Sequence, residues 1–183
     1  LKSANPPVAV GEIGLDFFIP DFDAPEQEWF FAEQLKIARA YDLAVSLHVR
    51  RSQDHILKHL RRIRVRGGFA HAFNGSAQQA EEFVKLGFCL GFGGTATFPQ
   101  AQRIRALLRE VPIEHVVVET DAPDIPPSFL GTMSSRERNS PVYLPRIGEM
   151  LANVRGMSPD AFAAATTANV RRVLGPPVLA RGS

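Results

Sequence analysis

Short apolar runs alternate with segments of helical periodicity along the chain, and this alternation limits the possible folds more than any other feature of the sequence. The runs occupy residues 8–10, 44–47, 68–70, 88–92 and 116–119. Helical patterns fill the gaps over about 23–41, 53–62, 76–87 and 99–111, and two more follow at about 141–154 and 159–174. Strands that alternate with helices at intervals of about 20 to 25 residues are typical of a parallel sheet. We therefore predict an α/β fold with five parallel strands.

The first helix shows how the apolar pattern predicts its buried side. Asp23 and Glu26 have the spacing of a capping box, as do Ser76 and Gln79 at the third helix. Within the first helix the residues expected to form the buried stripe are Phe31, Leu35 and Ala38, widened by Phe30, Ile37 and Tyr41.

The number of strands indicates an incomplete barrel. A closed barrel of such units has eight strands and typically ~250 residues, whereas this chain has 183 residues. We expect one domain over residues 1–183 that forms the C-terminal portion of a (β/α)8 TIM barrel, with about five of the eight strand–helix units. The two final helices follow the last predicted strand and look like the end of the barrel, so we place the missing units before Leu1. Residues 176–183 are predicted to be a mobile tail.

Composition sets outer limits on the class of protein. No apolar run is long enough to span a bilayer, and the chain does not begin like a signal peptide, so we expect no membrane contact. A single cysteine, Cys89, excludes an intramolecular disulfide and is compatible with the cytoplasm. The formal net charge of +2 does not by itself indicate nucleic acid.

Four apolar runs lead into side chains that can bind metal ions: Glu12, His48, His71 and Asp121. Because the carboxyl ends of parallel strands meet at one edge of a sheet, we expect these four groups to converge. Imidazole with carboxylate suits a hydrolytic site for divalent ions. The alternatives are that a single histidine is a packed core residue and that Asp121 only caps a helix. The remaining histidines, at positions 55, 59 and 115, are expected on the surface.

Other polar groups near the same edge are candidates for contact with phosphate. Arg50 follows His48 by two residues, and Asn74 and Ser76 follow His71 into a helix N-terminus, although capping alone explains Ser76 nearly as well. The basic segment 58–66 is expected to be the solvated outer face of a helix. The glycines of segment 91–96, followed by Glu119, weakly match a dinucleotide-binding motif, and we favour tight packing as their use.

These motifs, taken together, resemble the TatD family of metal-dependent deoxyribonucleases. The matching pieces are Gly-Glu-Ile-Gly-Leu-Asp at 11–16, Leu-His at 47–48, His-Ala-Phe-Asn-Gly-Ser at 71–76, Glu-Thr-Asp-Ala-Pro at 119–123 and Thr-Thr-Ala-Asn at 166–169. The resemblance implies a (β/α)8 barrel of the metal-dependent hydrolase type with two divalent ions, Mg²⁺, Mn²⁺ or Zn²⁺. It also implies hydrolysis of phosphodiester bonds in DNA, at single strands or ends, by a metal-activated water.

The resemblance also implies roles for individual residues. Glu12 would bridge two ions, His48 and His71 would hold one, and Asp121 would belong to the other. Asp121 would also position the attacking water and accept its proton, with Glu119 as the less favoured base. Family members begin with a His-x-His-x-Asp strand, and nothing similar precedes Glu12 here. This chain is therefore expected to hold one ion or none.

Two alternatives stay open from the sequence. One is a metal-dependent hydrolase of a small amide or ester, and the other is a truncated, non-catalytic barrel that acts as a binding or scaffold module. The sequence leaves the oligomeric state undetermined.

Overall fold

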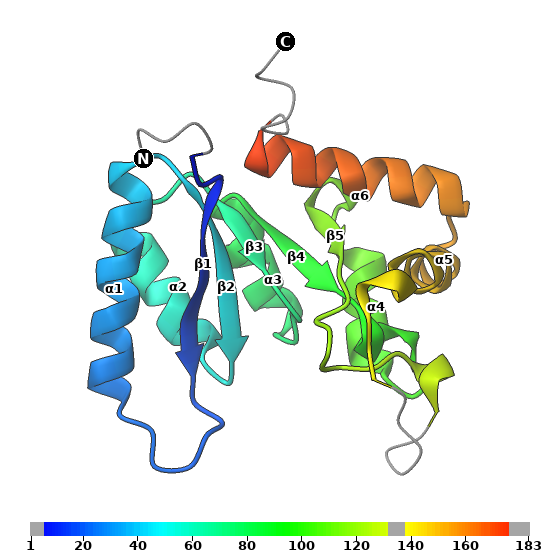
Figure 1. Ribbon diagram of the computed structural model, residues 1–183, viewed down its shortest axis with the longest axis horizontal. Coiled ribbons are helices and arrows are strands. Elements are labelled where there is room, and N and C mark those ends of the chain that lie inside the picture. Colours follow the sequence, from blue (N-terminus) through cyan, green and yellow to red (C-terminus); the bar gives the residue numbers. More distant parts are fainter. Residues whose placement is uncertain (1–5, 132–137, 176–183) are drawn as a thin grey trace.

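Five parallel strands form one curved sheet in the computed structural model, which describes residues 6–131 and 138–175 (Figure 1). The strands are β1 (Ala9–Asp16), β2 (Ala44–Arg50), β3 (Gly68–Ala70), β4 (Phe88–Phe92) and β5 (Val116–Val118). Each pairs with its neighbour in sequence, so the order in the sheet is the order in the chain. The predicted parallel sheet is confirmed. Within the described part of the chain β1 and β5 are its two edges, and the barrel is open between them.

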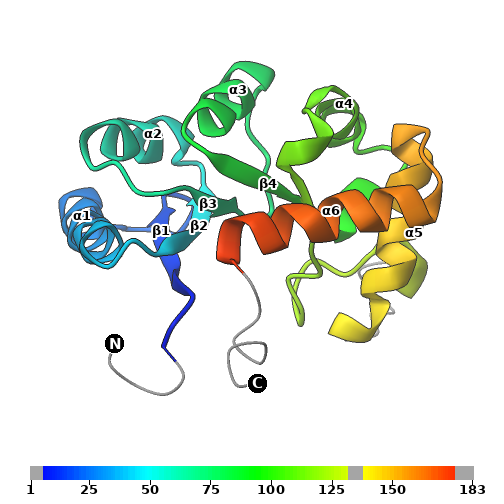
Figure 2. The same ribbon diagram turned by 90° about the horizontal axis from the view of Figure 1, so that it is seen from above.

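In the described residues, six α-helices accompany the sheet: α1 (Ala24–Ala40), α2 (Gln53–Arg62), α3 (Ala77–Lys85), α4 (Gln102–Glu110), α5 (Leu144–Arg155) and α6 (Pro159–Leu174). Four short 3₁₀ turns complete the fold: η1 (Gly94–Thr97), η2 (Ile113–His115), η3 (Ser128–Leu130) and η4 (Pro141–Tyr143). Figure 2 shows α1 to α4 along the outer side of the curved sheet. Helix α6 instead crosses the end of the sheet where the strands begin (Figure 1).

Two apolar clusters hold these layers together. The larger one joins the strands to the surrounding helices and includes Leu47, Phe83 and Leu108. The smaller one joins Ala44, Cys89 and Val117 of three strands to Val173 of α6. Helix α6 therefore covers the end of the sheet at the amino ends of the strands. The carboxyl ends, where parallel β/α proteins place their sites, stay accessible.

The Thr-Thr-Ala-Asn motif at 166–169 has a structural use in α6. The buried Asn169 side chain donates from Nδ2 to the carbonyl oxygens of Ile113, at 2.7 Å, and Val116, at 2.8 Å. The buried Thr166 hydroxyl donates to the Phe162 carbonyl oxygen at 3.0 Å. Buried polar groups need such partners, and the two Asn169 bonds fix α6 to the start of β5.

Two strands extend further than the sequence indicates. Both β1 and β2 continue to residues 16 and 50, so Glu12 and His48 lie within strands and not after them. The pairing of Val10 with Val45 and of Ile13 with Leu47 leaves one extra residue in β1, which is a β-bulge at Gly11 and Glu12. A bulge bends a strand and redirects a side chain. The expectation that all four candidate ligands follow strand ends is therefore wrong for these two.

The predicted stripe of α1 is too wide. Phe31, Leu35 and Ala38 are buried as expected, but Phe30, Ile37 and Tyr41 are each more than half exposed. The three exposed side chains lie on a flank of α1 that the described sheet does not cover. Asp23 accepts a hydrogen bond from the Glu26 amide at 2.9 Å, so it caps this helix as predicted.

Helix α4 begins at Gln102, later than the predicted start at about residue 99. The 3₁₀ turn η1 and four further residues precede it. The buried Thr97 hydroxyl donates to the Gly94 carbonyl oxygen at 2.6 Å and closes that turn. The long loop after β5 contains η3, and the predicted mobile tail at 176–183 lies outside the described residues. Within the described ranges, none of the helices combines the length and apolar character that a membrane span requires.

Candidate metal centre

Three of the predicted ligands, from three elements, converge on one point. Glu12 Oε1 lies 2.7 Å from His48 Nδ1 and 2.6 Å from His71 Nε2, and these two nitrogens are 3.4 Å apart. The bulge in β1 aims Glu12 at the histidines, His48 lies in β2, and His71 follows β3 directly. Two imidazole nitrogens and a carboxylate oxygen therefore share one small volume.

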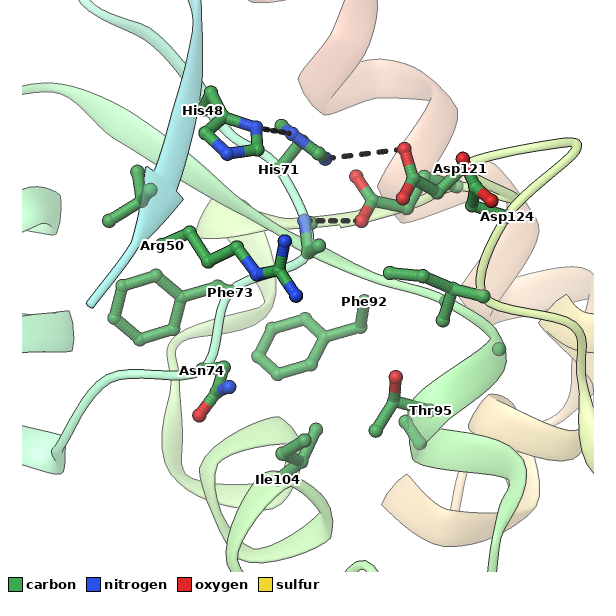
Figure 3. Close-up of a pocket in the computed structure, with 18 of the residues that line it drawn as sticks. His48, Arg50, His71, Phe73, Asn74, Phe92, Thr95, Ile104, Asp121 and Asp124 are labelled. Atoms are coloured by element: carbon green, nitrogen blue, oxygen red, sulfur yellow. Dashed lines mark hydrogen bonds and ion pairs between the residues drawn. The ribbon is translucent and has the colours of Figure 1, made fainter. Parts of the chain in front are cut away.

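Asp121 lies beside this group and outside it. Its Oδ1 is 3.6 Å from His71 Nδ1, the ring nitrogen that faces away from Glu12, and Figure 3 shows the two side chains next to each other. Asp121 has a left-handed backbone, with φ of 55°, three residues after the end of β5. Partial burial raises the pKa of the Asp121 carboxyl, and the nearby Glu12 and Asp124 carboxylates add to this rise, although His71 opposes it.

Glu119 occupies the deepest acidic position. Burial raises the pKa of its carboxyl to about 7, although a hydrogen bond from the Ala72 amide to Oε1 favours the ionised form. A Cβ atom on Gly91 would lie 2.0 Å from Glu119 Oε2. The glycine at this position therefore makes room for Glu119, which agrees with tight packing as the use of this glycine-rich segment.

The donor set fits a divalent cation. The carboxylates of Glu12, Glu119, Asp121 and Asp124 lie near one another, and repulsion between them adds to the burial that raises the pKa values of Glu119 and Asp121. A divalent ion removes that repulsion, and imidazole with carboxylate is a common ligand combination for Zn²⁺ and related metals. Glu12, His48 and His71 are the residues that can hold such an ion.

The candidate phosphate-binding residues divide between two places. Arg50 and Asn74 line a cavity of about 870 Å³ that also includes His48, His71 and Asp121, and Figure 3 shows Arg50 extending into it. Ser76 is exposed and caps α3, accepting from the Gln79 amide at 3.1 Å within a complete capping box. A contact between Ser76 and phosphate stays a prediction.

Three residues to which sequence reasoning gave no role support the site. Asp16 lies 3.3 Å from His48 Nε2 and 3.5 Å from Arg50 Nη1. Burial alone would raise the pKa of this carboxyl, but hydrogen bonds from the Phe18 amide and His48, with the charge of Arg50, lower it. Arg103 donates to Asn74 Oδ1, and the buried Asn139 donates to the Thr120 and Asp124 carbonyl oxygens at 2.7 Å and 2.6 Å.

The sequence offered little sign of these supporting residues. Asp16 belongs to the Gly-Glu-Ile-Gly-Leu-Asp motif, which was the one available clue. Arg103 lies on a helix and carries no sign of its partner Asn74, and Asn139 comes from a loop without regular periodicity.

One of the other three histidines is not on the surface. His59 is buried, and its Nε2 lies 3.0 Å from Glu28 Oε2, because α2 packs against α1 at this point. The prediction of a surface position for His59 is therefore wrong. His55 is exposed, with Nδ1 2.6 Å from Glu28 Oε1, and the partly buried His115 lies 3.0 Å from the Phe88 carbonyl oxygen. The basic side chains of segment 58–66 are exposed as expected.

Comparison with known structures supports the fold. A crystal structure of YjjV, a TatD homologue from Escherichia coli K12, matches with a TM-score of 0.84 at 41% identity, over 93% of this chain and 64% of that one. A TatD family hydrolase from Entamoeba histolytica matches with a TM-score of 0.77 at 20% identity, over 93% of this chain and 64% of that one, and supports the fold alone. The predicted α/β barrel architecture is thereby confirmed, with the barrel open in this chain.

Comparison with known sequences assigns the family. The uncharacterized metal-dependent hydrolase YjjV of Escherichia coli (strain K12) is 42% identical over 93% of this chain and 64% of that protein. The 3'-5' ssDNA/RNA exonuclease TatD of Citrobacter rodentium is 36% identical over 92% of this chain and 65% of that protein. The chain thus spans about two thirds of the length of these relatives. A family model described as TatD related DNase matches residues 2–175. The chain therefore belongs to the TatD family.

Proposed function

We propose that the protein is a divalent-metal-dependent hydrolase that cleaves phosphodiester bonds in DNA, working on single strands or ends. The observation that carries this proposal is the convergence of Glu12, His48 and His71, with Asp121 beside them, in a cavity whose wall includes Arg50. Relatives named as metal-dependent hydrolases and as 3'-5' ssDNA/RNA exonucleases support it. Because the chain spans 64% of its relative's length, the activity of the whole protein is part of the proposal.

The metal ligands are proposed to be Glu12, His48 and His71 for one ion, with Asp121 and the bridging Glu12 available to a second. A divalent ion in this place would supply a lowered pKa for water and compensation for the negative charge of the reacting phosphate. Asp16 keeps the His48 ring in position through its contact with Nε2, and such secondary contacts orient metal ligands.

Asp121 is proposed to position the attacking water and to accept its proton. Its carboxylate is partly exposed to the cavity, and its raised pKa makes it a better proton acceptor than an ordinary aspartate. Glu119 has one oxygen engaged by the Ala72 amide and is held against Gly91, so it is less free to approach a substrate. Glu119 is therefore the second choice for the base.

Phosphate is proposed to bind Arg50 and Asn74. Arg103 donates to the Asn74 side-chain oxygen, so the Nδ2 group of Asn74 stays available as a donor to phosphate. Arg50, the last residue of β2, adds a cation. Guanidinium groups bind phosphate oxygens with strong, charge-assisted bonds. This arrangement favours an anionic phosphodiester over a neutral amide or ester.

The remaining expectations are also proposals. Residues 1–183 form one domain, the C-terminal part of the barrel, and the protein works in the cytoplasm, which the buried and unpaired Cys89 permits. Mg²⁺, Mn²⁺ and Zn²⁺ are the candidate ions.

A substrate panel tests the proposed function. The chain is incubated with labelled single-stranded DNA, duplex DNA, RNA, bis(4-nitrophenyl) phosphate and a small ester and amide, each with Mg²⁺, Mn²⁺ or Zn²⁺. We expect metal-dependent cleavage of phosphodiesters, lowered by about 10²-fold or more in Asp121→Asn and unchanged in Glu149→Gln, an exposed acid of α5. Turnover of the ester or amide alone would favour the small-substrate hydrolase. No turnover with any substrate would favour a non-catalytic binding module.

A further inference from the structure

Two guanidinium groups lie against one phenyl ring at the wall of the cavity. The Cζ atoms of Arg50 and Arg51 are 4.0 Å and 4.5 Å from the centroid of the Phe18 ring. All three residues line the same cavity as His48 and His71. We propose that these three residues, here called the arginine–aromatic platform, bind a nucleobase next to the phosphate at the metal centre. The inference rests on the proposed function and adds to it a binding site for a nucleobase of the substrate.

The platform is exposed where a ligand can reach it. Phe18 is 47% exposed and the Arg50 side chain is 51% exposed. Nucleobases stack on aromatic rings and on guanidinium planes, and this stacking depends little on sequence. A base in a duplex already has neighbours on both faces, so a base that stacks here comes from a single strand. The cavity volume of about 870 Å³ also exceeds what one phosphate group requires.

One carboxylate connects the platform to the proposed metal ligands. Asp16 Oδ1 accepts a hydrogen bond from the Phe18 amide at 2.9 Å, while Oδ2 lies 3.3 Å from His48 Nε2. The same Oδ2 is 3.5 Å from Arg50 Nη1. The ring, one guanidinium and a metal ligand are therefore held in a fixed relation. A nucleotide with its base on this platform can place its phosphate near His48.

The backbone at Arg51 supports a role beyond packing. Its φ of 55° lies in the left-handed region that favours glycine or asparagine. Arginine at this turn instead adds an exposed cation to the cavity wall, and no ion pair of Arg51 occurs among the residues that the structure describes. Unfavourable backbone conformations of this kind are often kept at functional sites. By contrast, Arg61 on the outer side of α2 is already paired with Glu82 at 2.7 Å.

Fluorescence anisotropy tests the platform independently of catalysis. The probes are a labelled oligothymidylate, an abasic strand of the same length and the corresponding duplex, all titrated with the chain in EDTA. The variants are Phe18→Ala, Phe18→Tyr and Arg51→Gln. Two matched controls, Trp29→Ala and Arg62→Gln, change an exposed aromatic residue of α1 and an exposed arginine of α2, both away from the cavity.

The parent chain is expected to bind the oligothymidylate about tenfold more tightly than the abasic strand, and more tightly than the duplex. Phe18→Ala should bind the two single strands equally, whereas Phe18→Tyr should keep the preference. Arg51→Gln should reduce the slope of log affinity against log salt by about 0.7. Both controls should stay within about twofold of the parent.

Three results would overturn the platform: no binding of the oligothymidylate, equal binding of the two strands by the parent, or an unchanged preference in Phe18→Ala. Metal-dependent cleavage of bis(4-nitrophenyl) phosphate without any preference for bases would leave the proposed hydrolase intact and refute the platform. A preference that depends on Phe18, without hydrolysis of any substrate, would support the platform and contradict the proposed function.

Discussion

Replacing Gly91 by alanine tests whether the packing of Glu119 is as tight as the structure shows. The added Cβ would lie 2.0 Å from Glu119 Oε2 and 2.6 Å from Cδ, so the carboxylate has to move. Overpacking of this kind costs about 1–3 kcal/mol. Loss of the hydrogen bond from the Ala72 amide to the displaced carboxylate adds about 1–3 kcal/mol. We therefore expect Gly91→Ala to lower the free energy of unfolding by roughly 2–6 kcal/mol.

Urea denaturation measures this loss. With a typical slope of about 2 kcal/mol per M, the midpoint should fall by roughly 1–3 M. The matched control is Gly148→Ala in α5, where the added Cβ meets no atom within 4 Å and a gain of up to ~1 kcal/mol is expected. In a Glu119→Ala background the clash is gone, so the cost of Gly91→Ala should shrink by about 1 kcal/mol or more. A midpoint that Gly91→Ala leaves unchanged, or an equal cost in both backgrounds, would refute this account of Glu119.

Three further predictions concern residues around the site and between the helices. The pKa of Glu28 is lowered to about 2, first by the hydrogen bond from His59 and then by that from His55, with Lys58 adding its charge. The ionised carboxylate therefore contributes stability above about pH 4.5 that is lost as the pH falls toward 2. In denaturation experiments at several pH values, Glu28→Gln should remove roughly 1–2 kcal/mol of this pH dependence. An unchanged pH profile in the variant would contradict the prediction. Asn139→Ala removes the two hydrogen bonds that this buried side chain donates to the Thr120 and Asp124 carbonyl oxygens, so the free energy of unfolding should fall by about 1–3 kcal/mol, whereas the exposed Asn153→Ala should change it little. Arg103→Ala frees the Asn74 side chain, so KM for a phosphodiester should rise by about tenfold with a smaller change in kcat; a fall in kcat alone would count against a binding role.

The order of strands and helices follows from the sequence because each unit is local. Val116 to Val118 is a short run of β-branched residues, and the helix from Gln53 to Arg62 has the predicted limits. Parallel strands that are neighbours in sequence bring their carboxyl ends together, so the closeness of His48 and His71 was predictable from spacing alone. The ring nitrogens of these two residues are 3.4 Å apart.

The features that could not be predicted depend on contacts between distant segments. The bulge at Glu12 exists only relative to the register of β2, which the sequence of β1 does not contain. Burial of His59 requires α2 to pack against Glu28 of α1. Asn139 holds the backbone near Asp121 from a loop without a recognisable pattern. On α1, helical periodicity predicts which apolar side chains lie near one another, but it does not indicate which of them the neighbouring sheet covers.

Titration calorimetry with Mn²⁺ tests the central claim most directly, because the claim is that Glu12, His48 and His71 form one metal centre. The parent chain should release or absorb heat with saturable binding, and His71→Ala should abolish this signal. His55→Ala, which changes an exposed histidine of α2 bonded to Glu28, should leave it intact. No saturable heat in the parent, or the same binding curve in His71→Ala, would contradict the account.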